Sequence, residues 1–358
     1  MYKVAIIGCG RISHKIAEGV AKNNDRMKLV VLCDPIEEKM FETEKTYNKK
    51  VEKENTILKY KDYKEILKEN KIDIAIISTE SGYHEEIGLY FLENGVNLII
   101  EKPLAMSIEG AQKLVDTAKK NNLKLAASHQ NRFNYPIQLL KKAIKENRLG
   151  RIFNGMARIL WTRDDNYYLQ APWRGTWALD GGTLMNQCIH NIDLINWMMD
   201  DEIDTVYAQT SNYIRNIEAE DYGVILIRYK SGKIATIEGS AIVYPKNLEE
   251  TLTVTGEKGT VVIGGMAVNK INTWRVEGDN EQEYLSIDCG DPNSVYGYGH
   301  EALYKDFVDA LDENREPLVN GIAGLNAVKI ILAAYKSQKT GLPIKFNEFL
   351  KFSTVDMR

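Results

Sequence analysis

A lysine and a histidine in this chain are of the types that could act together on a substrate hydroxyl. Lys102 lies in Glu101-Lys102-Pro103, directly after an apolar run that ends at Ile100. A lysine there can hydrogen-bond a hydroxyl and stabilise negative charge on its oxygen. His190 is one of five histidines, and an imidazole is the natural general base near neutral pH. Since a single lysine at a strand end is more often solvated and a single helical histidine more often structural, the prediction depends on the elements around them.

Polar side chains recur around His190 at helical spacing. If this segment is one helix, Asn186, His190 and Asp193 share a face at positions i, i+4 and i+7. A polar neighbour of this kind can fix the tautomer of a histidine. We therefore expect His190 to remove the hydroxyl proton while Asn186 holds the same oxygen or a neighbouring hydroxyl. Because protein groups polarise the hydroxyl, no metal is expected.

A glycine turn near the start of the chain has the context of a dinucleotide site. Gly8-Cys9-Gly10-Arg11-Ile12-Ser13 follows one apolar run and opens a helical pattern. Gly8 allows a tight turn, and Gly10 lets the backbone approach a pyrophosphate at the helix N-terminus. The third glycine of the fingerprint is replaced by Ser13, which is also small.

Asp34 ends the second apolar run, where a carboxylate can accept hydrogen bonds from both adenosine ribose hydroxyls. The same carboxylate would repel a 2′-phosphate, so the sequence favours NAD over NADP as the cofactor. The alternative is that Asp34-Pro35 merely forms a turn.

The elements that position these residues form two predicted domains. Residues 1–128 alternate apolar runs with helical patterns, which predicts a Rossmann domain with a doubly wound parallel sheet. Its expected strands are Lys3–Ile7, Lys28–Cys33, Asp73–Ser78 and Val96–Ile100. Ligands of such sheets bind at the carboxyl ends of the strands, so Lys102 should face the cofactor.

Residues 129–358 change character, because predicted strands follow one another directly. We expect strands at Ile152–Thr162, Thr205–Tyr213, Tyr222–Lys230, Ile234–Val243, Thr251–Thr255 and Thr260–Ile263. This order predicts an α+β domain with a large, mainly antiparallel, open-faced sheet. An open sheet face favours a homodimer or homotetramer through this sheet. A late amphipathic helix should end at Gly341.

Composition excludes several classes of function. The net charge of −4 gives no basic stripe for nucleic acid, and no apolar run is long enough to span a membrane. The four cysteines are scattered without zinc-type spacing, which fits a reducing compartment and a cytoplasmic location.

Taken together, these motifs resemble the Gfo/Idh/MocA oxidoreductases, a family named for glucose-fructose oxidoreductase and inositol dehydrogenase. The resemblance extends over nearly the whole chain, and Glu101-Lys102-Pro103 with the His190–Asp193 segment carries it most specifically. It implies that Lys102 and His190 are catalytic and that the bond before Pro103 is cis. It also implies contacts to the cofactor from Gly8, Gly10, Arg11, Ile12, Asp34, Ser78, Thr79, His84, Glu101, Lys102, Trp173 and Arg174.

Two departures from the family pattern bear on the substrate and on the cofactor contacts of the loop after Thr79, respectively. Many inositol-dehydrogenase-like members have aspartate where this chain has Asn186, and an amide cannot join a proton relay. Glu80-Ser81 replaces the common Pro-Asn after Thr79. The sequences from Trp173 to Trp177 and from Leu184 to Gln187 resemble UDP-N-acetylglucosaminuronate 3-dehydrogenases, which implies NAD-dependent oxidation of a ring hydroxyl on a sugar nucleotide.

Arg163 is the residue expected to bind a charged group of that substrate, because a guanidinium pairs a carboxylate or phosphate bidentately. The substrate contacts expected are therefore Lys102, Arg163, Asn186 and His190, although Arg163 could also be a surface residue. The alternatives are an inositol or free-sugar dehydrogenase and a non-catalytic NAD-sensing regulator. A regulator would not need both Lys102 and His190.

Overall fold

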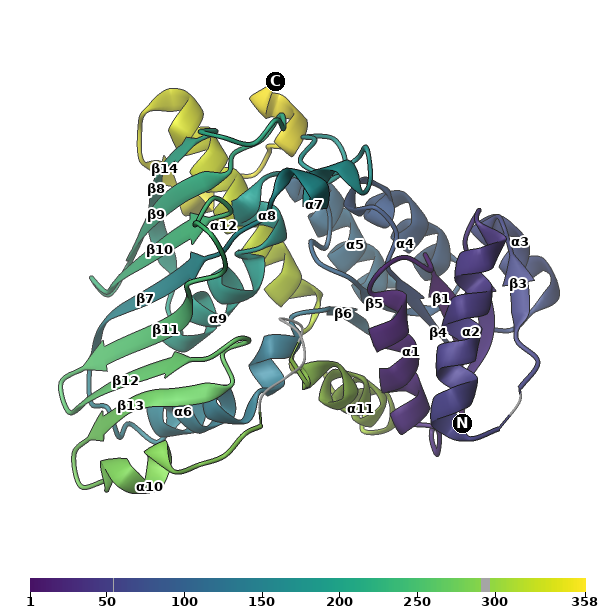
Figure 1. Ribbon diagram of the computed structural model, residues 1–358, viewed down its shortest axis with the longest axis horizontal. Helices are drawn as coiled ribbons and strands as arrows, with labels where there is room; N and C mark the ends of the chain where they lie inside the picture. The colour runs from purple at the N-terminus through teal and green to yellow at the C-terminus, as the bar shows by residue number, and fades with distance from the viewer. Residues whose placement is uncertain (54, 291–296) are drawn as a thin grey trace. The chain divides into compact units, whose positions relative to one another are not determined.

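The computed structural model describes residues 1–53, 55–290 and 297–358. By its packing the chain divides into two compact units, whose elements are labelled in Figure 1. The first unit consists of Met1–Ser128 and His300–Leu325, and the second of His129–Gly299 and Asn326–Arg358. A single division after residue 128 therefore leaves out the return of residues 300–325 to the first unit.

The first unit contains a six-stranded parallel sheet in the order β3-β2-β1-β4-β5-β6, so the predicted doubly wound sheet is confirmed. Its strands are β1 (Tyr2–Ile7), β2 (Met27–Cys33), β3 (Leu58–Tyr60), β4 (Ile74–Ile77), β5 (Asn97–Ile100) and β6 (Leu125–Ala127). The central strands are apolar without alternation, because helices cover both of their faces. Strands β3 and β6 were not predicted, since three residues are too few to give an apolar pattern.

Five longer helices connect these strands: α1 (Ser13–Lys22), α2 (Glu37–Val51), α3 (Tyr63–Glu69), α4 (His84–Glu93) and α5 (Ile108–Lys120). Helix α1 buries Ile16 and Val20, the apolar stripe at helical spacing. Strand order reverses between β1 and β4, which are neighbours in the sheet. The carboxyl ends of strands beside such a switch point are where open α/β sheets bind ligands.

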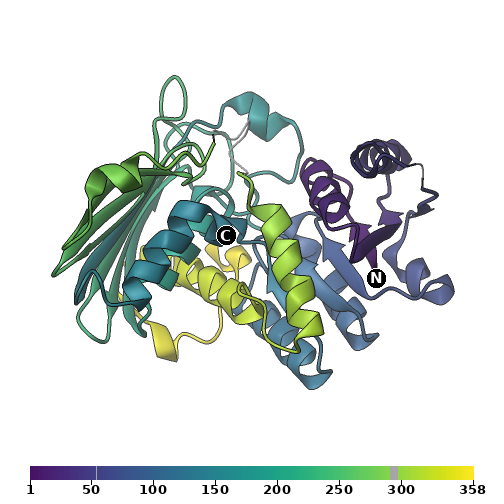
Figure 2. The ribbon, with the colours of Figure 1, turned by 90° about the horizontal axis from the view of Figure 1, so that it is seen from below.

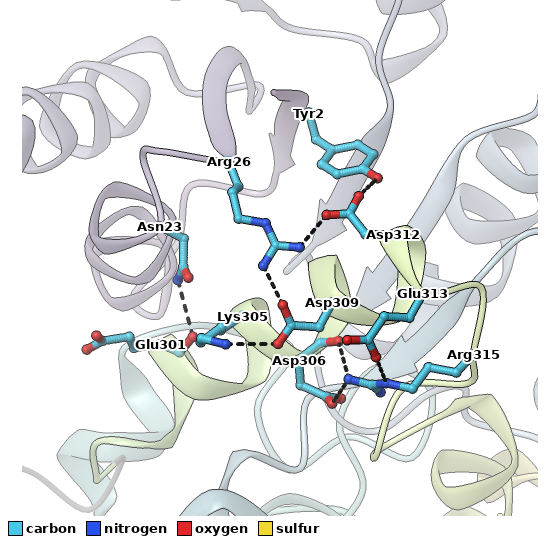
Figure 3. A network of polar contacts seen from close by, with 10 residues as sticks. All are labelled: Tyr2, Asn23, Arg26, Glu301, Lys305, Asp306, Asp309, Asp312, Glu313 and Arg315. Carbon is cyan, nitrogen blue, oxygen red and sulfur yellow. Dashed lines mark hydrogen bonds and ion pairs between the residues drawn. The ribbon is translucent and has the colours of Figure 1, made fainter.

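Helix α11 (Gly299–Asp312) brings the chain back to the first unit, where a polar network holds it (Figure 3). Arg26 pairs with Asp309 and, at 2.6 Å, with Asp312 of this helix. Lys305 bonds Asp309 at 2.9 Å. The helix also packs closely on α1, because a Cβ at Gly19 would lie 2.6 Å from the ring of Tyr304.

The second unit contains an eight-stranded sheet in the order β13-β12-β11-β7-β10-β9-β8-β14. Its strands are β7 (Ile152–Leu160), β8 (Ile203–Ser211), β9 (Tyr222–Tyr229), β10 (Ile234–Ser240), β11 (Glu249–Gly256), β12 (Gly259–Gly264), β13 (Lys270–Val276) and β14 (Ile344–Lys345). All the pairings are antiparallel except that of β7 with β10, which confirms the mainly antiparallel sheet. Strands β13 and β14 were not predicted.

The remaining helices are α6 (Tyr135–Lys145), α7 (Asp165–Leu169), α8 (Thr183–Asn186), α9 (Ile189–Met199), α10 (Glu281–Leu285) and α12 (Gly321–Thr340). Figure 2 shows the teal α6 and the yellow α12 on the same face of the sheet. Helix α9 packs against β7, where a Cβ at Gly155 would lie 2.4 Å from Ile195. Helix α12 ends just before Gly341, whose φ is +71°, as predicted.

The other face of this sheet carries side chains that alternate with the buried ones. Met156, Val224 and Leu226 are 44%, 36% and 44% exposed. Thr236 of β10 lies between Met156 and Leu226 in the strand register. This face therefore has an apolar centre. In the described part of the chain, no helix is both long and apolar enough to cross a membrane.

We predict that Arg26→Gln lowers the free energy of unfolding by about 1 kcal/mol, and by less at high salt, since partly exposed ion pairs are weak and screened. The hydrogen bond from Arg26 holds the pKa of Asp309 below its usual value. The stabilisation is therefore present above the unfolded pKa of about 4 and is lost as the pH falls through the folded pKa. Urea unfolding at several pH values measures both. Arg275→Gln, at a 75% exposed arginine, is the control; an equal loss in both variants would contradict the prediction.

Candidate active site

The glycine turn between β1 and α1 is shaped by its neighbours in the sheet. Gly8 has a φ of +92°, and a Cβ there would lie 2.6 Å from the backbone of Ser78. The Ser78 hydroxyl donates a hydrogen bond of 2.7 Å to the Gly8 carbonyl. A Cβ at Gly10, by contrast, would meet no atom within 4 Å. The turn therefore closes on β4 at Gly8 and leaves open space at Gly10.

Asp34 follows β2 at the same edge of the sheet. Its carboxylate accepts hydrogen bonds from the backbone of Cys9 at 2.8 Å and of Ile36 at 2.9 Å. These bonds fix the carboxylate beside the glycine turn, and a carboxylate has lone pairs for further donors. Open backbone at Gly10, a helix N-terminus and a fixed acid fit the pyrophosphate and ribose of NAD. Gly8, Gly10 and Asp34 would hold the cofactor; the contacts predicted for Arg11 and Ile12 stay predictions.

Lys102 follows β5, and its peptide bond to Pro103 is cis, as the resemblance implies. Glu101, by contrast, is buried in its own unit, with one carboxylate oxygen 3.9 Å from His300 of α11. Burial raises the pKa of Glu101 and lowers that of His300 to about 4. Both groups are therefore biased toward their neutral forms, and Glu101 directly precedes Lys102 in the chain.

His84 has a similar supporting place. Its Nδ1 lies 2.7 Å from the carbonyl of Pro103, and its Nε2 lies 3.1 Å from the carbonyl of Thr79. Burial lowers the pKa of this imidazole. The ring therefore joins the loop after β4 to the loop that carries Lys102. Direct contact of His84, Glu101 or Thr79 with the cofactor stays a prediction.

In the second unit, the segment around His190 differs from the expected single helix. Helix α8 ends at Asn186, and the amide of Cys188 bonds the carbonyl of Thr183, five residues back. This wide turn separates Asn186 from His190, which lies in α9. Strands β9 and β10 leave room for the turn, because Gly223 and Gly239 are paired there. A Cβ at either glycine would collide with Leu184 or Cys188.

Asp180 sets the orientation of the Asn186 amide. The Asn186 Nδ2 donates a hydrogen bond to one oxygen of Asp180, while the other oxygen accepts one of 2.8 Å from Gly175. Since an ionised carboxylate can only accept, the amide must present its nitrogen to Asp180 and its Oδ1 elsewhere. That Oδ1 accepts a bond of 3.1 Å from Gln187. The Asn186 amide is therefore oriented with its nitrogen toward Asp180 and its oxygen toward Gln187.

Asp193 does not serve His190 as its sequence spacing suggested. Its two oxygens accept hydrogen bonds of 2.7 and 2.6 Å from Arg132, and both side chains are buried. The residue that meets His190 is His129, whose Nδ1 lies 3.5 Å from the Nδ1 of His190. His129 and Arg132 were not predicted from the sequence, although their separation of three residues matches that of His190 and Asp193.

Two arginines flank one aromatic ring in this unit. The guanidinium of Arg163 lies 5.3 Å from the ring centroid of Tyr167, and that of Arg174 lies 4.3 Å from it. Each guanidinium also stacks on a tryptophan, Arg163 on Trp161 and Arg174 on Trp173. Among the residues that the structure describes, neither arginine forms an ion pair with a carboxylate. Two positive charges therefore lie beside the same ring, and neither has a carboxylate partner within residues 1–53, 55–290 and 297–358.

Glu250 is a buried acid whose pKa is affected by the charge of Arg163. Burial raises its pKa to about 8, against the hydrogen bond from Asn191 and the charge of Arg163. At neutral pH the neutral form of Glu250 therefore predominates, and the charge of Arg163 is not balanced by it.

We predict that Asp193→Asn lowers the free energy of unfolding by about 3–5 kcal/mol, because it leaves the Arg132 guanidinium buried without its carboxylate. Glu202→Gln, three residues after the end of the same helix and in an exposed pair with Lys230 (70% and 52% exposed), should cost about 1 kcal/mol or less. Urea unfolding of the two variants measures the difference. Equal losses would show that the buried pair does not fasten α9.

Comparison with known proteins gives two family matches. Residues 2–129 match the oxidoreductase family with an NAD-binding Rossmann fold. Residues 137–262 match the GFO/IDH/MocA C-terminal domain. The two matches together cover more than half of the chain.

Similar proteins include both sugar-nucleotide and polyol dehydrogenases. The WlbA dehydrogenase of Bordetella pertussis, solved with NADH and UDP-GlcNAcA, is 32% identical with a TM-score of 0.85, covering 96% of this chain and 98% of its own. WlbA of Chromobacterium violaceum, solved with the same ligands, has the same identity and TM-score and covers 96% of this chain and 95% of its own. The myo-inositol 2-dehydrogenase of Thermotoga maritima is 24% identical over 353 residues, which are 97% of this chain and 99% of the relative.

Proposed function

This chain belongs to the GFO/IDH/MocA family of oxidoreductases, and from that membership we propose that it oxidises a ring hydroxyl of UDP-N-acetylglucosaminuronic acid. The membership itself makes the chain an NAD-dependent oxidoreductase acting on CH–OH groups of sugars or polyols. The sugar nucleotide, the hydroxyl at position 3 and the roles of the residues are the proposal.

In this mechanism side chains of the protein bind and deprotonate the substrate hydroxyl. Bound NAD supplies the hydride acceptor. His190 removes the hydroxyl proton, and the ammonium of Lys102 donates a hydrogen bond to the same oxygen, where it stabilises developing negative charge. Asn186, whose amide is oriented by its bond to Asp180, holds a neighbouring hydroxyl or amide N–H of the ring. The alcohol loses one hydride and one proton and becomes a ketone.

The pair of arginines on Tyr167 is the observation that carries the choice of substrate. A uronic acid linked to a nucleoside diphosphate has a carboxylate and two phosphates, whereas inositols and free sugars are neutral. Unbalanced guanidinium groups bind such anions with charge-assisted hydrogen bonds, and neither Arg163 nor Arg174 has an ion-pair partner in the described ranges. We assign the carboxylate to Arg163, while Trp173 and Arg174 stay the residues predicted to lie beside the nicotinamide.

We predict that UDP-N-acetylglucosaminuronic acid reduces NAD with a higher kcat/KM than UDP-N-acetylglucosamine or myo-inositol does. Arg163→Gln should lower kcat/KM for the acid by about tenfold to a hundredfold, because it removes hydrogen bonds to a charged group. The value for UDP-N-acetylglucosamine, which lacks the carboxylate, should change little. NADH absorbance measures all three substrates.

Arg151→Gln, at an exposed arginine of the same unit, is the matched control and should leave both values unchanged. A preference for myo-inositol would favour the polyol dehydrogenase. Tight NAD binding without turnover of any of the three substrates would favour a regulator.

The uncovered face of the eight-stranded sheet supports a homo-oligomer, dimer or tetramer. Its centre is apolar around Met156 and Leu226, and an apolar sheet face is stabilised by burial against a second copy. Free thiols at all four cysteines support a reducing, cytoplasmic compartment.

We predict that Leu226→Glu shifts the native protein to a smaller species in light scattering, because a charge on each copy would meet its counterpart across the interface. Leu58→Glu is the matched control, since Leu58 in the first unit is also 44% exposed. A monomeric wild type, or equal dissociation of both variants, would contradict the proposal.

A further inference from the structure

We propose that His129 is a positioning residue that keeps a proton on Nδ1 of His190, so that Nε2 of His190 is the atom that accepts the substrate proton. The inference rests on the proposed role of His190 as the base. His129 touches neither substrate nor cofactor in this role, since it acts through the imidazole beside it.

The two rings meet edge to face in the second unit. Their centroids are 5.6 Å apart, their planes cross at 86°, and the two Nδ1 atoms are 3.5 Å apart. His129 is buried and His190 is half-buried, so His129 forms the inner side of the pair. Because Nδ1 of His190 faces His129, Nε2 lies on the opposite side of the ring, and we assign this nitrogen to the substrate.

Arg132 and Asp193 hold this pair in place. Each lies three residues after its histidine. The turn that carries His129 and the helix that carries His190 therefore make two contacts, one between the two histidines and one between Arg132 and Asp193. The contact between Arg132 and Asp193 is a bidentate ion pair, with bonds of 2.7 and 2.6 Å. Arg132 also lies 4.8 Å from the ring of Trp197 on α9. The distance between the two imidazoles is therefore set by a rigid contact beside them.

Two nitrogens in contact can share only one proton, so one must donate and the other accept. If His190 donates from Nδ1, its Nε2 carries a lone pair and can act as a base. If His129 donates instead, Nε2 of His190 carries the hydrogen and cannot take the substrate proton. Once His190 is protonated at Nε2, its Nδ1–H still needs an acceptor, which a neutral His129 provides. The first arrangement therefore serves both states of the base.

A neutral partner has a different effect from the carboxylate that often orients a catalytic histidine. A carboxylate raises the pKa of the imidazole, whereas His129 orients the ring without adding negative charge. Arg132 and Asp193 beside the pair neutralise each other, and the buried Glu250 on β11 reaches α9 through Asn191. Fixing the tautomer is thus separate from making the base stronger.

Nitrogen NMR of isotope-labelled imidazoles tests the inference directly, because the two tautomers of a neutral histidine have different nitrogen shifts. In the wild type His190 should carry its proton on Nδ1. His129→Leu should move that proton to Nε2 or give a mixture, and His129→Asn, whose Oδ1 can accept near the place of the lost Nδ1, should restore the wild-type pattern. An unchanged tautomer in His129→Leu, or a wild type protonated on Nε2, would overturn the inference.

Kinetics with NAD and UDP-N-acetylglucosaminuronic acid give the second readout. His129→Leu should lower kcat by at least about tenfold with little change in KM, since it removes part of the general-base contribution. His129→Asn should recover most of this loss, and His129→Asp should move the acidic limb of the pH profile upward by about one unit. In a His190→Ala background, His129→Leu should have no further effect.

The two proposals fail in different ways. Wild-type turnover in His190→Ala, or no turnover of this substrate by the wild type, counts against the proposed function, and the NMR result still decides the role of His129. An inactive His190→Ala together with a fully active His129→Leu counts against His129 alone. A general loss of folding is recognised by weakened NAD binding and a lower unfolding midpoint, which His129→Asn should not share.

Discussion

The buried ion pair of Arg132 and Asp193 is the contact on which the polar groups of the second unit depend. It connects a short turn after β6 with the middle of α9, and its two parallel hydrogen bonds fix orientation as well as distance. A buried charge pair contributes little net stability compared with apolar packing, but it is costly to break. Its value here is geometric, because α9 cannot rotate or slide without losing it.

Glycines in the sheet complete this constraint from the other side. Gly155 lets Ile195 of α9 approach β7, and the paired Gly223 and Gly239 make room for Leu184 and Cys188. The helical segments therefore lie closer to the strands than larger residues would allow. This close approach leaves room for the wide turn between α8 and α9, where Asn186 lies beside Asp180 and His190 lies beside His129. The glycines of the strands and the ion pair of Arg132 and Asp193 together determine where the polar atoms lie.

The features predicted from the sequence are those that depend on short, continuous stretches of the chain. Gly8, Asp34 and Lys102 each follow an apolar strand of the parallel sheet, so the fold of the first unit and the edge at which they gather could be inferred. The antiparallel sheet could be inferred as well, because its predicted strands follow one another directly in the sequence.

What was missed depends on partners distant in the sequence. Arg132 and Asp193 are 61 residues apart, as are His129 and His190. Helical spacing placed Asp193 on the same face as His190, which is correct for a regular helix but says nothing of a competing arginine. The glycines that leave room for the turn at Cys188 lie in two later strands, and the short β14 pairs with β8.

The return of α11 to the first unit determines when that unit can fold during synthesis. Leu303, Tyr304 and Phe307 are almost completely buried, and the Tyr304 ring fills the space at Gly19. When the ribosome has made only the first 128 residues, this apolar surface on α1 has no cover. Helix α11 therefore reaches the Rossmann sheet only after residues 129–299 have been translated. Native packing around α1 is thus completed late, which prolongs the exposure of this apolar surface to chaperones and to aggregation.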